Sequence, residues 1–314
     1  MKGYNIDIWR LQRRTKQLDP DFVTMTRPGI RLIDLPTTQV RVRVAGQGNR
    51  TIVFACDMPN VVENYDEVIR SLEQDYHVVC FEQPGFGFSY PKPGFTFTRQ
   101  AYADMLTNML RELAMGPYIL AFPCVSIFYA LQVAAQHADL IEQLVLMQAT
   151  NWSRQRDWAA IVVGRFLLVT AALPVLGTQV TATPFLGQVV WAAVEPAFAR
   201  RTHPHVIYKA AERPELFQRL SRPLYEAFDH GACNCMASAF QHYFKDPEAT
   251  IPRVEQPTLI LWATGDRSHR LSDSHGLMAY APNAVWQDIP DTGHHLELEN
   301  PEGVTKAIKR FLIA

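Results

Sequence analysis

The segment from Tyr118 to Gln136 constrains the fold of this chain most, because it sets a cysteine between a strand and a helix. Tyr118–Phe122 is a short apolar run with the length and composition of a buried strand, and residues 127–136 carry apolar side chains at helical spacing. The turn between them reads Pro123-Cys124-Val125. A side chain on such a sharp turn stands clear of both elements, at a helix N-terminus whose free N–H groups favour negative charge. The pattern predicts a site for a Cys124 thiolate.

Other apolar runs indicate a parallel sheet around this unit. Residues 51–55 and 77–81 are continuously apolar, as in strands buried on both faces, whereas 29–35 and 40–44 alternate apolar and polar residues like an antiparallel hairpin. Further strands are expected at 144–147, 258–262 and 285–289, and helices at 65–72, 98–113, 271–280 and 301–312. This alternation predicts an α/β fold with a doubly wound, mostly parallel sheet.

The alternation stops after residue 147 and resumes at residue 258, an interval far too long for an ordinary loop. We therefore predict an N-terminal leading helix at 1–25, a core made of 26–150 and 252–314, and an inserted helical cap at 151–251. The first half of the cap is strongly apolar, but prolines, glycines and an arginine interrupt it before it reaches the length of a membrane span. Cap helices around an apolar cavity are the favoured interpretation.

Several segments resemble the α/β hydrolase superfamily. Cys124 takes the place of the serine in the family's G-x-S-x-G turn, with Phe122 and Ser126 at the two glycine positions. Residues 82–89 (EQPGFGFS) resemble the family's D-x-x-G-x-G-x-S turn, and residues 291–312 resemble its histidine loop and C-terminal helix. The resemblance implies the α/β-hydrolase fold with an inserted helical cap over the nucleophile.

The resemblance also implies a catalytic triad. Asp266 follows the strand at 258–262, where the family has its acid, and His294 in the Gly293-His294 pair matches the family's catalytic histidine. The chain order of nucleophile, acid and histidine is that of the family. Together they predict a triad of Cys124, His294 and Asp266.

The same resemblance places an oxyanion hole at the backbone N–H groups of Val125 and Met58. The family's loop usually begins His-Gly, but here it reads Cys56-Asp57-Met58-Pro59, which brings a carboxylate near the expected negative charge. Candidate substrate contacts around this site are Asp57, His295, Phe122 and Ser126.

Composition narrows the classes of partner. The formal net charge is −1 and no basic run occurs, so a nucleic-acid partner is not expected. The first residues have no signal-peptide pattern, and five cysteines without a regular framework suggest reduced thiols, so we expect a cytoplasmic protein. Cys233 and Cys235 lack zinc spacing, and neither a metal nor a cofactor is expected.

These observations predict an acyl-transfer enzyme, either a thioesterase or other hydrolase or an acyltransferase. A cysteine readily attacks activated acyl groups, so the expected partner is a small hydrophobic acyl substrate, free or linked to a carrier or coenzyme A, as in secondary metabolism. The residues expected to line its pocket are Phe166, Leu167, Leu173, Leu176, Phe185, Leu186 and Trp191. Two alternatives stay open: a non-hydrolytic lyase, cyclase or isomerase using His294 and Asp57, and a catalytically inactive ligand-binding protein. The oligomeric state is left open as well.

Overall fold

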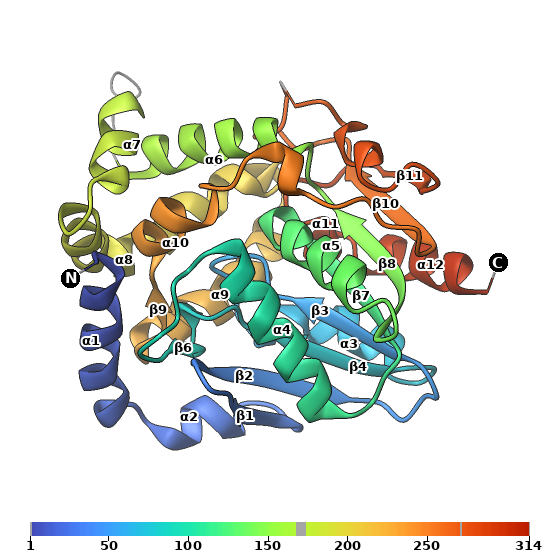
Figure 1. Cartoon of the computed structure of the whole chain (residues 1–314), viewed down its shortest axis with the longest axis horizontal. Coiled ribbons are helices and arrows are strands. Elements are labelled where there is room, and N and C mark those ends of the chain that lie inside the picture. The colour runs from blue at the N-terminus through green and yellow to red at the C-terminus, as the bar shows by residue number, and fades with distance from the viewer. Residues whose placement is uncertain (1, 168–173, 271, 314) are drawn as a thin grey trace.

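One mixed sheet forms the centre of the molecule (Figure 1). The computed structural model describes residues 2–167, 174–270 and 272–313. Within them the sheet order is β1-β2-β4-β3-β7-β8-β10-β11, with β6 also paired to β2. The strands are β1 (Ile30–Asp34), β2 (Thr38–Ala45), β3 (Thr51–Ala55), β4 (His77–Phe81), β6 (Tyr90–Pro91), β7 (Tyr118–Pro123), β8 (Ile141–Met147), β10 (Thr258–Ala263) and β11 (Val285–Ile289). Pairing is antiparallel at β1–β2–β4 and parallel from β4 to β11, which confirms the predicted α/β fold.

Helices cover both faces of this sheet. Alternate residues of the central strands point to opposite sides: Val53 and Leu120 belong to one hydrophobic cluster, Ile52 to the other. The first cluster packs under α4 (Arg99–Leu113) and α5 (Ile127–Gln136), and the second under α3 (Asp66–Leu72) and α12 (Pro301–Leu312). Because both faces are buried, these strands have continuous apolar runs.

Five α-helices of the described chain come between β8 and β10 in the sequence, and Figure 1 shows them above and to the left of the sheet. They are α6 (Trp152–Leu167), α7 (Pro174–Ala182), α8 (Leu186–Val206), α9 (Pro214–Asp229) and α10 (Met236–Tyr243). A short pairing of β5 (Phe86–Gly87) with β9 (Cys233–Asn234) joins this helical insertion to the core. Among the residues that the structure describes, no helix has both the length and the apolarity to cross a membrane.

The N-terminal residues form two α-helices, with a 3-10 turn at Thr15–Gln17 between them, instead of the single helix predicted for 1–25. These are α1 (Tyr4–Arg14) and α2 (Pro20–Met25). The break occurs because the Asp19 side chain caps the N–H of Asp21 and Pro20 favours the first position of a helix. Helix α1 packs on the inserted helices, since Ser238 Oγ donates a hydrogen bond to Asp7 at 2.6 Å.

The predicted helix at 271–280 is wrong. The described residues there contain only a 3-10 turn at Gly276–Ala279, while Leu271 lies outside the described residues. The side-chain carboxylate of Asp273 accepts a hydrogen bond from the N–H of His275, and the backbone carbonyl of Asp273 accepts one from the N–H of Gly276. Such local bonds from aspartate compete with helix formation.

Candidate active site

Cys124 occupies a strained turn between β7 and α5. Its backbone φ is +51°, in the left-handed region that residues other than glycine rarely adopt. A conformation of this kind costs about 1–3 kcal/mol and persists where the surrounding structure enforces it. Two hydrogen bonds brace the turn: Ser126 Oγ donates to the carbonyl of Pro123 at 2.5 Å, and Tyr243 Oη of α10 donates to the carbonyl of Val125 at 2.6 Å. The chain therefore holds the thiol in a defined position.

His294 and Asp266 meet beside this turn. They lie in the loops that follow β11 and β10, and His294 Nδ1 is 3.0 Å from Asp266 Oδ2. Asp266 also accepts hydrogen bonds from Gln148 Nε2 at 2.8 Å and from the backbone N–H and hydroxyl of Ser268 at 2.7 Å. Burial alone would raise the pKa of Asp266, but the hydrogen bond from His294 and the neighbouring charges lower it below its usual range. Asp266 is thus an ionised, fixed partner of the imidazole.

Asp57 lies on the opposite side of the same imidazole. Its Oδ2 atom is 3.2 Å from His294 Nε2 and 3.2 Å from His295 Nδ1. Burial would raise the pKa of Asp57, but hydrogen bonds from the two histidines lower it below its usual range. The Asp57 backbone N–H donates to Tyr65 Oη at 3.0 Å, and this hydroxyl donates to Glu297 at 2.8 Å, so the loop is anchored to the core.

His294 is consequently a stabilised imidazolium. Burial acts to lower the pKa of His294, whereas Cys124 and the carboxylates of Asp266 and Asp57 raise it well above its usual value. The two carboxylates, and Cys124 when it is a thiolate, thus favour the protonated form of this histidine.

The sulfur of Cys124 completes this group. Donor atoms of Asp57, Cys124 and His294 all lie within 4.8 Å of one another. Burial and the negative charge of Asp57 raise the pKa of the Cys124 thiol to about 11, although His294 and the N–H of Val125 act in the opposite direction. Gln155 Nε2 lies 3.4 Å from the sulfur. In the resting site the thiol is mostly protonated.

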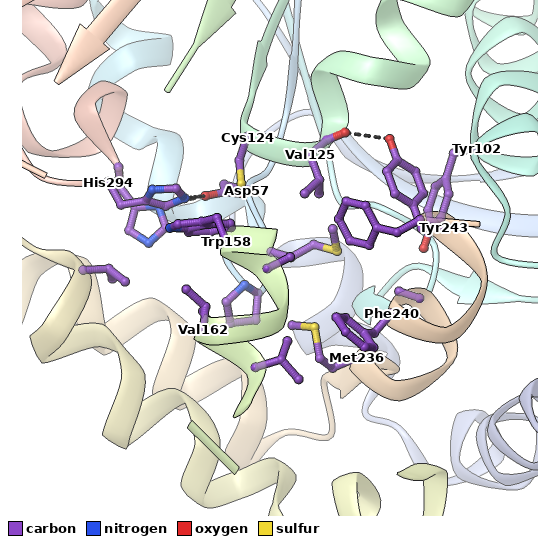
Figure 2. A pocket seen from close by; sticks show the side chains of 18 residues that line it. Asp57, Tyr102, Cys124, Val125, Trp158, Val162, Met236, Phe240, Tyr243 and His294 are labelled. Carbon is purple, nitrogen blue, oxygen red and sulfur yellow. Dashed lines mark hydrogen bonds and ion pairs between the residues drawn. The ribbon is translucent and has the colours of Figure 1, made fainter. Parts of the chain in front are cut away.

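A small apolar cavity opens in front of the sulfur (Figure 2). Its volume is about 100 Å³, and it is lined on the insertion side by side chains of α6 (Trp158, Val162, Val163) and α10 (Met236, Phe240, Tyr243). Figure 2 shows Cys124, Asp57 and His294 at one end and Val162, Met236 and Phe240 on the opposite side. A group bound here would meet aliphatic and aromatic walls with the reactive atoms at one end.

Some of the other predicted site residues line the cavity and others do not. Val125, Met58, Asp57 and His295 line the cavity. Phe122 and Ser126 do not lie among the described lining residues, so expecting them to contact substrate was wrong. Phe122 is fully buried against Phe81 and Tyr129, and the Ser126 hydroxyl is used within the turn. Both residues shape the turn from behind.

The residues predicted to line the pocket were also mostly wrong. Leu176, Phe185 and Leu186 are 45%, 40% and 49% exposed. Trp191 is buried against Val163 and Ala237 and is not among the described residues that line the cavity. Leu173 lies outside the described residues, as do the side chains of Phe166 and Leu167. Apolar composition alone did not show which face of each helix turns toward the site.

Sequence reasoning missed several residues beside His294. Trp158 of α6 stacks on the His294 ring at 5.0 Å between centroids, and His269 stacks on both rings, at 4.5 Å from Trp158 and 5.4 Å from His294. Burial lowers the pKa of His269 to about 3, so this ring is neutral. Gln148, at the carboxyl end of β8, could have been found from its place at the strand edge where such sites form. Trp158 and Gln155 carried no such signal.

Among the residues that the structure describes, two groups of side chains have atoms close enough to hold a metal ion: Asp57, Cys124 and His294, and Asp266, His269 and His294. Both groups use His294, whose two ring nitrogens already contact carboxylates at 3.0 and 3.2 Å. A metal in either position would replace one of these contacts. The site as it stands is a hydrogen-bonded acid–base network.

Comparison with known proteins matches this architecture. A family model described as the α/β hydrolase family matches residues 53–307. The uncharacterized hydrolase YugF of Bacillus subtilis is 21% identical over 267 residues, which cover 84% of this chain and 90% of YugF.

Solved structures show the same fold. An esterase from Thermogutta terrifontis has a TM-score of 0.66 and 20% identity, covering 90% of this chain and 98% of its own. A Bacillus megaterium epoxide hydrolase has a TM-score of 0.66 and 14% identity, covering 90% of this chain and 100% of its own. Because the family match runs from β3 into α12 and includes Cys124, Asp266 and His294, the chain belongs to the α/β hydrolase family.

Proposed function

We propose that this protein is an acyl-transfer enzyme in which Cys124 attacks the carbonyl carbon of an ester or thioester. The observation that carries the proposal is the left-handed backbone of Cys124, with φ of +51°, at a strand–helix turn whose sulfur adjoins the His294–Asp266 pair. Strain of this kind gathers at functional sites. A nucleophile, a base and a group that orients the base make up the general arrangement for covalent catalysis.

The reacting form is a Cys124 thiolate paired with the His294 imidazolium, and it forms when the resting thiol loses its proton to solvent. The thiolate adds to the carbonyl carbon, and collapse of the tetrahedral intermediate breaks the bond to the leaving alcohol or thiol, which takes the proton of His294. Neutral His294 then accepts a proton from the water or alcohol that attacks the acyl-cysteine. This step releases the acyl product and restores the thiolate–imidazolium pair. Asp266 orients the ring through Nδ1 and stabilises its charge.

The cavity supports a small apolar acyl group. An engineered protein cavity of about 150 Å³ holds benzene, so the roughly 100 Å³ here suits a short chain. Each methylene removed from water contributes about 0.8 kcal/mol. The alcohol, carrier or coenzyme A part of the substrate would lie outside this cavity.

A cytoplasmic location is part of the proposal. Each of the five cysteines is a free thiol, including Cys56 and Cys80, whose sulfur atoms are 3.5 Å apart in a hydrogen bond and not in a disulfide. Reduced neighbouring thiols are typical of a reducing compartment.

Asp57 favours a second candidate function. Its carboxylate is 3.2 Å from His294 Nε2, and negative charge developing about 4 Å from it would be destabilised by about 4 kcal/mol at an effective dielectric constant near 20. The same carboxylate, ionised and next to an imidazolium acid, is placed to accept a proton from a substrate. A lyase, cyclase or isomerase that transfers protons between Asp57, substrate and His294 would need no acyl-enzyme.

The two functions are separated by turnover of short p-nitrophenyl esters and acyl thioesters. Acyl transfer by Cys124 predicts that wild-type protein releases p-nitrophenol or free thiol and that Cys124→Ala does not. Release that persists in Cys124→Ala but is lost in Asp57→Asn would show hydrolysis with Asp57 as the base and would reject Cys124 as the nucleophile. Absence of release with every chain length tested would contradict the acyl-transfer proposal.

A further inference from the structure

We propose that Gln155 is a further catalytic residue, whose side-chain amide donates a hydrogen bond to Cys124 Sγ and stabilises the thiolate. The inference rests on the proposed role of Cys124 as nucleophile. Gln155 lies in the first turn of α6. One of the inserted helices would therefore help to stabilise the thiolate of Cys124.

The orientation of the amide is fixed by its two neighbours. The backbone N–H of Thr150 can only donate, and it lies 3.1 Å from Gln155 Oε1. The amide nitrogen therefore faces the sulfur, at 3.4 Å from Sγ. Gln155 is fully buried, so water does not compete for this hydrogen bond.

The N-terminal end of α6, which carries Gln155, is held by several hydrogen bonds. The backbone N–H of Trp152 donates to Tyr280 Oη at 2.9 Å, and its indole N–H donates to the carbonyl of Asp246 at 2.8 Å. The hydroxyl of Thr150 donates to the carbonyl of Asp273 at 2.7 Å. A donor positioned before the reaction stabilises a developing charge without reorganisation.

Charged and polar groups from several elements surround the sulfur of Cys124. Asp57, from the loop after β3, opposes a thiolate, whereas His294 and the N–H of Val125 favour it. Tyr243 of α10 lies nearby with its hydroxyl bonded to the carbonyl of Val125. The amide of Gln155 adds a donor to the thiolate without adding another charge to the site.

The test is the pH dependence of Cys124 alkylation by iodoacetamide, measured by mass spectrometry of the Cys124 peptide. Gln155→Met removes the donor at similar side-chain length. Gln155→Glu keeps an oxygen for the N–H of Thr150 but, at the alkaline pH where the thiol ionises, replaces the donor with a negative charge. We expect both variants to alkylate about tenfold more slowly at a given pH, the effect of a thiol pKa one unit higher.

Gln188→Met is the matched control. Gln188 is another fully buried glutamine of the inserted helices, but its amide bonds Ser238 and Gln241, away from the sulfur. The control should change the melting temperature and leave the alkylation profile as in wild type. Wild-type profiles in both Gln155 variants would show that Gln155 only anchors α6 and would overturn the inference.

The alkylation test of Gln155 can fail or succeed independently of the test for acyl transfer by Cys124. Alkylation reports the thiolate whether or not Cys124 forms an acyl-enzyme. A shifted profile in protein that traps no acyl group would retain Gln155 as a donor to the thiolate and reject acyl transfer. An unshifted profile in protein that does trap one would reject the role of Gln155 alone.

Discussion

His294 Nε2 lies 3.2 Å from Asp57 Oδ2, on the side of the imidazole opposite the 3.0 Å contact with Asp266. In a triad of the family's kind, this nitrogen serves the nucleophile. Here it is shared between a carboxylate and the sulfur of Cys124, because donor atoms of all three residues lie within 4.8 Å. After burial, the charge of Asp57 is what most opposes thiolate formation at Cys124.

Replacing Asp57 by asparagine should therefore activate the thiol. The change removes the negative charge that, together with burial, raises the pKa of Cys124 to about 11. We expect the thiol pKa to fall by about one unit or more, so that alkylation at pH 8 becomes roughly tenfold faster. Asp139→Asn, on the exposed surface, is the control. Slower alkylation in Asp57→Asn would show that the carboxylate assists the thiol.

The imidazolium of His294 should make stability depend on pH. Its folded-state pKa is raised above the unfolded value of about 6.5. The stabilisation is therefore fully present below about pH 6.5 and is lost as pH rises through the folded-state pKa.

The variant His294→Asn tests this dependence. The melting temperature of wild type should exceed that of the variant most near pH 6, and the difference should shrink toward pH 10. A difference that grows with rising pH would mean that the histidine is neutral in the folded protein.

The strained turn predicts an unusual order of stability among variants at position 124. A side chain in the left-handed region costs about 1–2 kcal/mol, which glycine avoids, and Cys124 has φ of +51°. Cys124→Gly should therefore unfold in urea with a free energy about 1 kcal/mol larger than Cys124→Ala, and both should lack turnover. If alanine proves the more stable of the two, the turn is not strained.

The cavity predicts a short optimum of acyl length. At about 0.8 kcal/mol per methylene, kcat/KM should rise about fourfold for each added methylene. In a cavity of about 100 Å³ the rise should level off after a few methylenes. Val162→Ala, which removes volume from the wall opposite Cys124, should move the optimum to longer chains. A preference for acetyl groups would contradict an apolar acyl pocket.

The core of the site was predictable because parallel strands bring their carboxyl ends to one edge. Cys124, Asp266 and His294 follow β7, β10 and β11, and their places came from strand patterns and the family's spacing. Asp57 was recognised as a carboxylate near the site. Its contact with His294 could not be foreseen, because the direction of a loop side chain depends on bonds such as that between the Asp57 N–H and Tyr65.

The inserted helices were the part that the sequence did not determine. Their apolar residues fit several faces, and Phe185 and Leu186 proved exposed while Val162 and Phe240 line the cavity. Gln155 acts through one hydrogen bond that depends on how α6 packs on the core. Neither helix packing nor such a bond has a local sequence signature.

The most direct test of the account is to trap the acyl-enzyme. Wild-type protein mixed with an activated short-chain ester or thioester, quenched in acid and measured as intact protein, should gain the mass of one acyl group. Peptide mapping should place that group on Cys124, and Cys124→Ala should show no gain. Product release by wild type without any acyl-cysteine, even at the earliest quench times and in His294→Ala, would contradict covalent catalysis by Cys124.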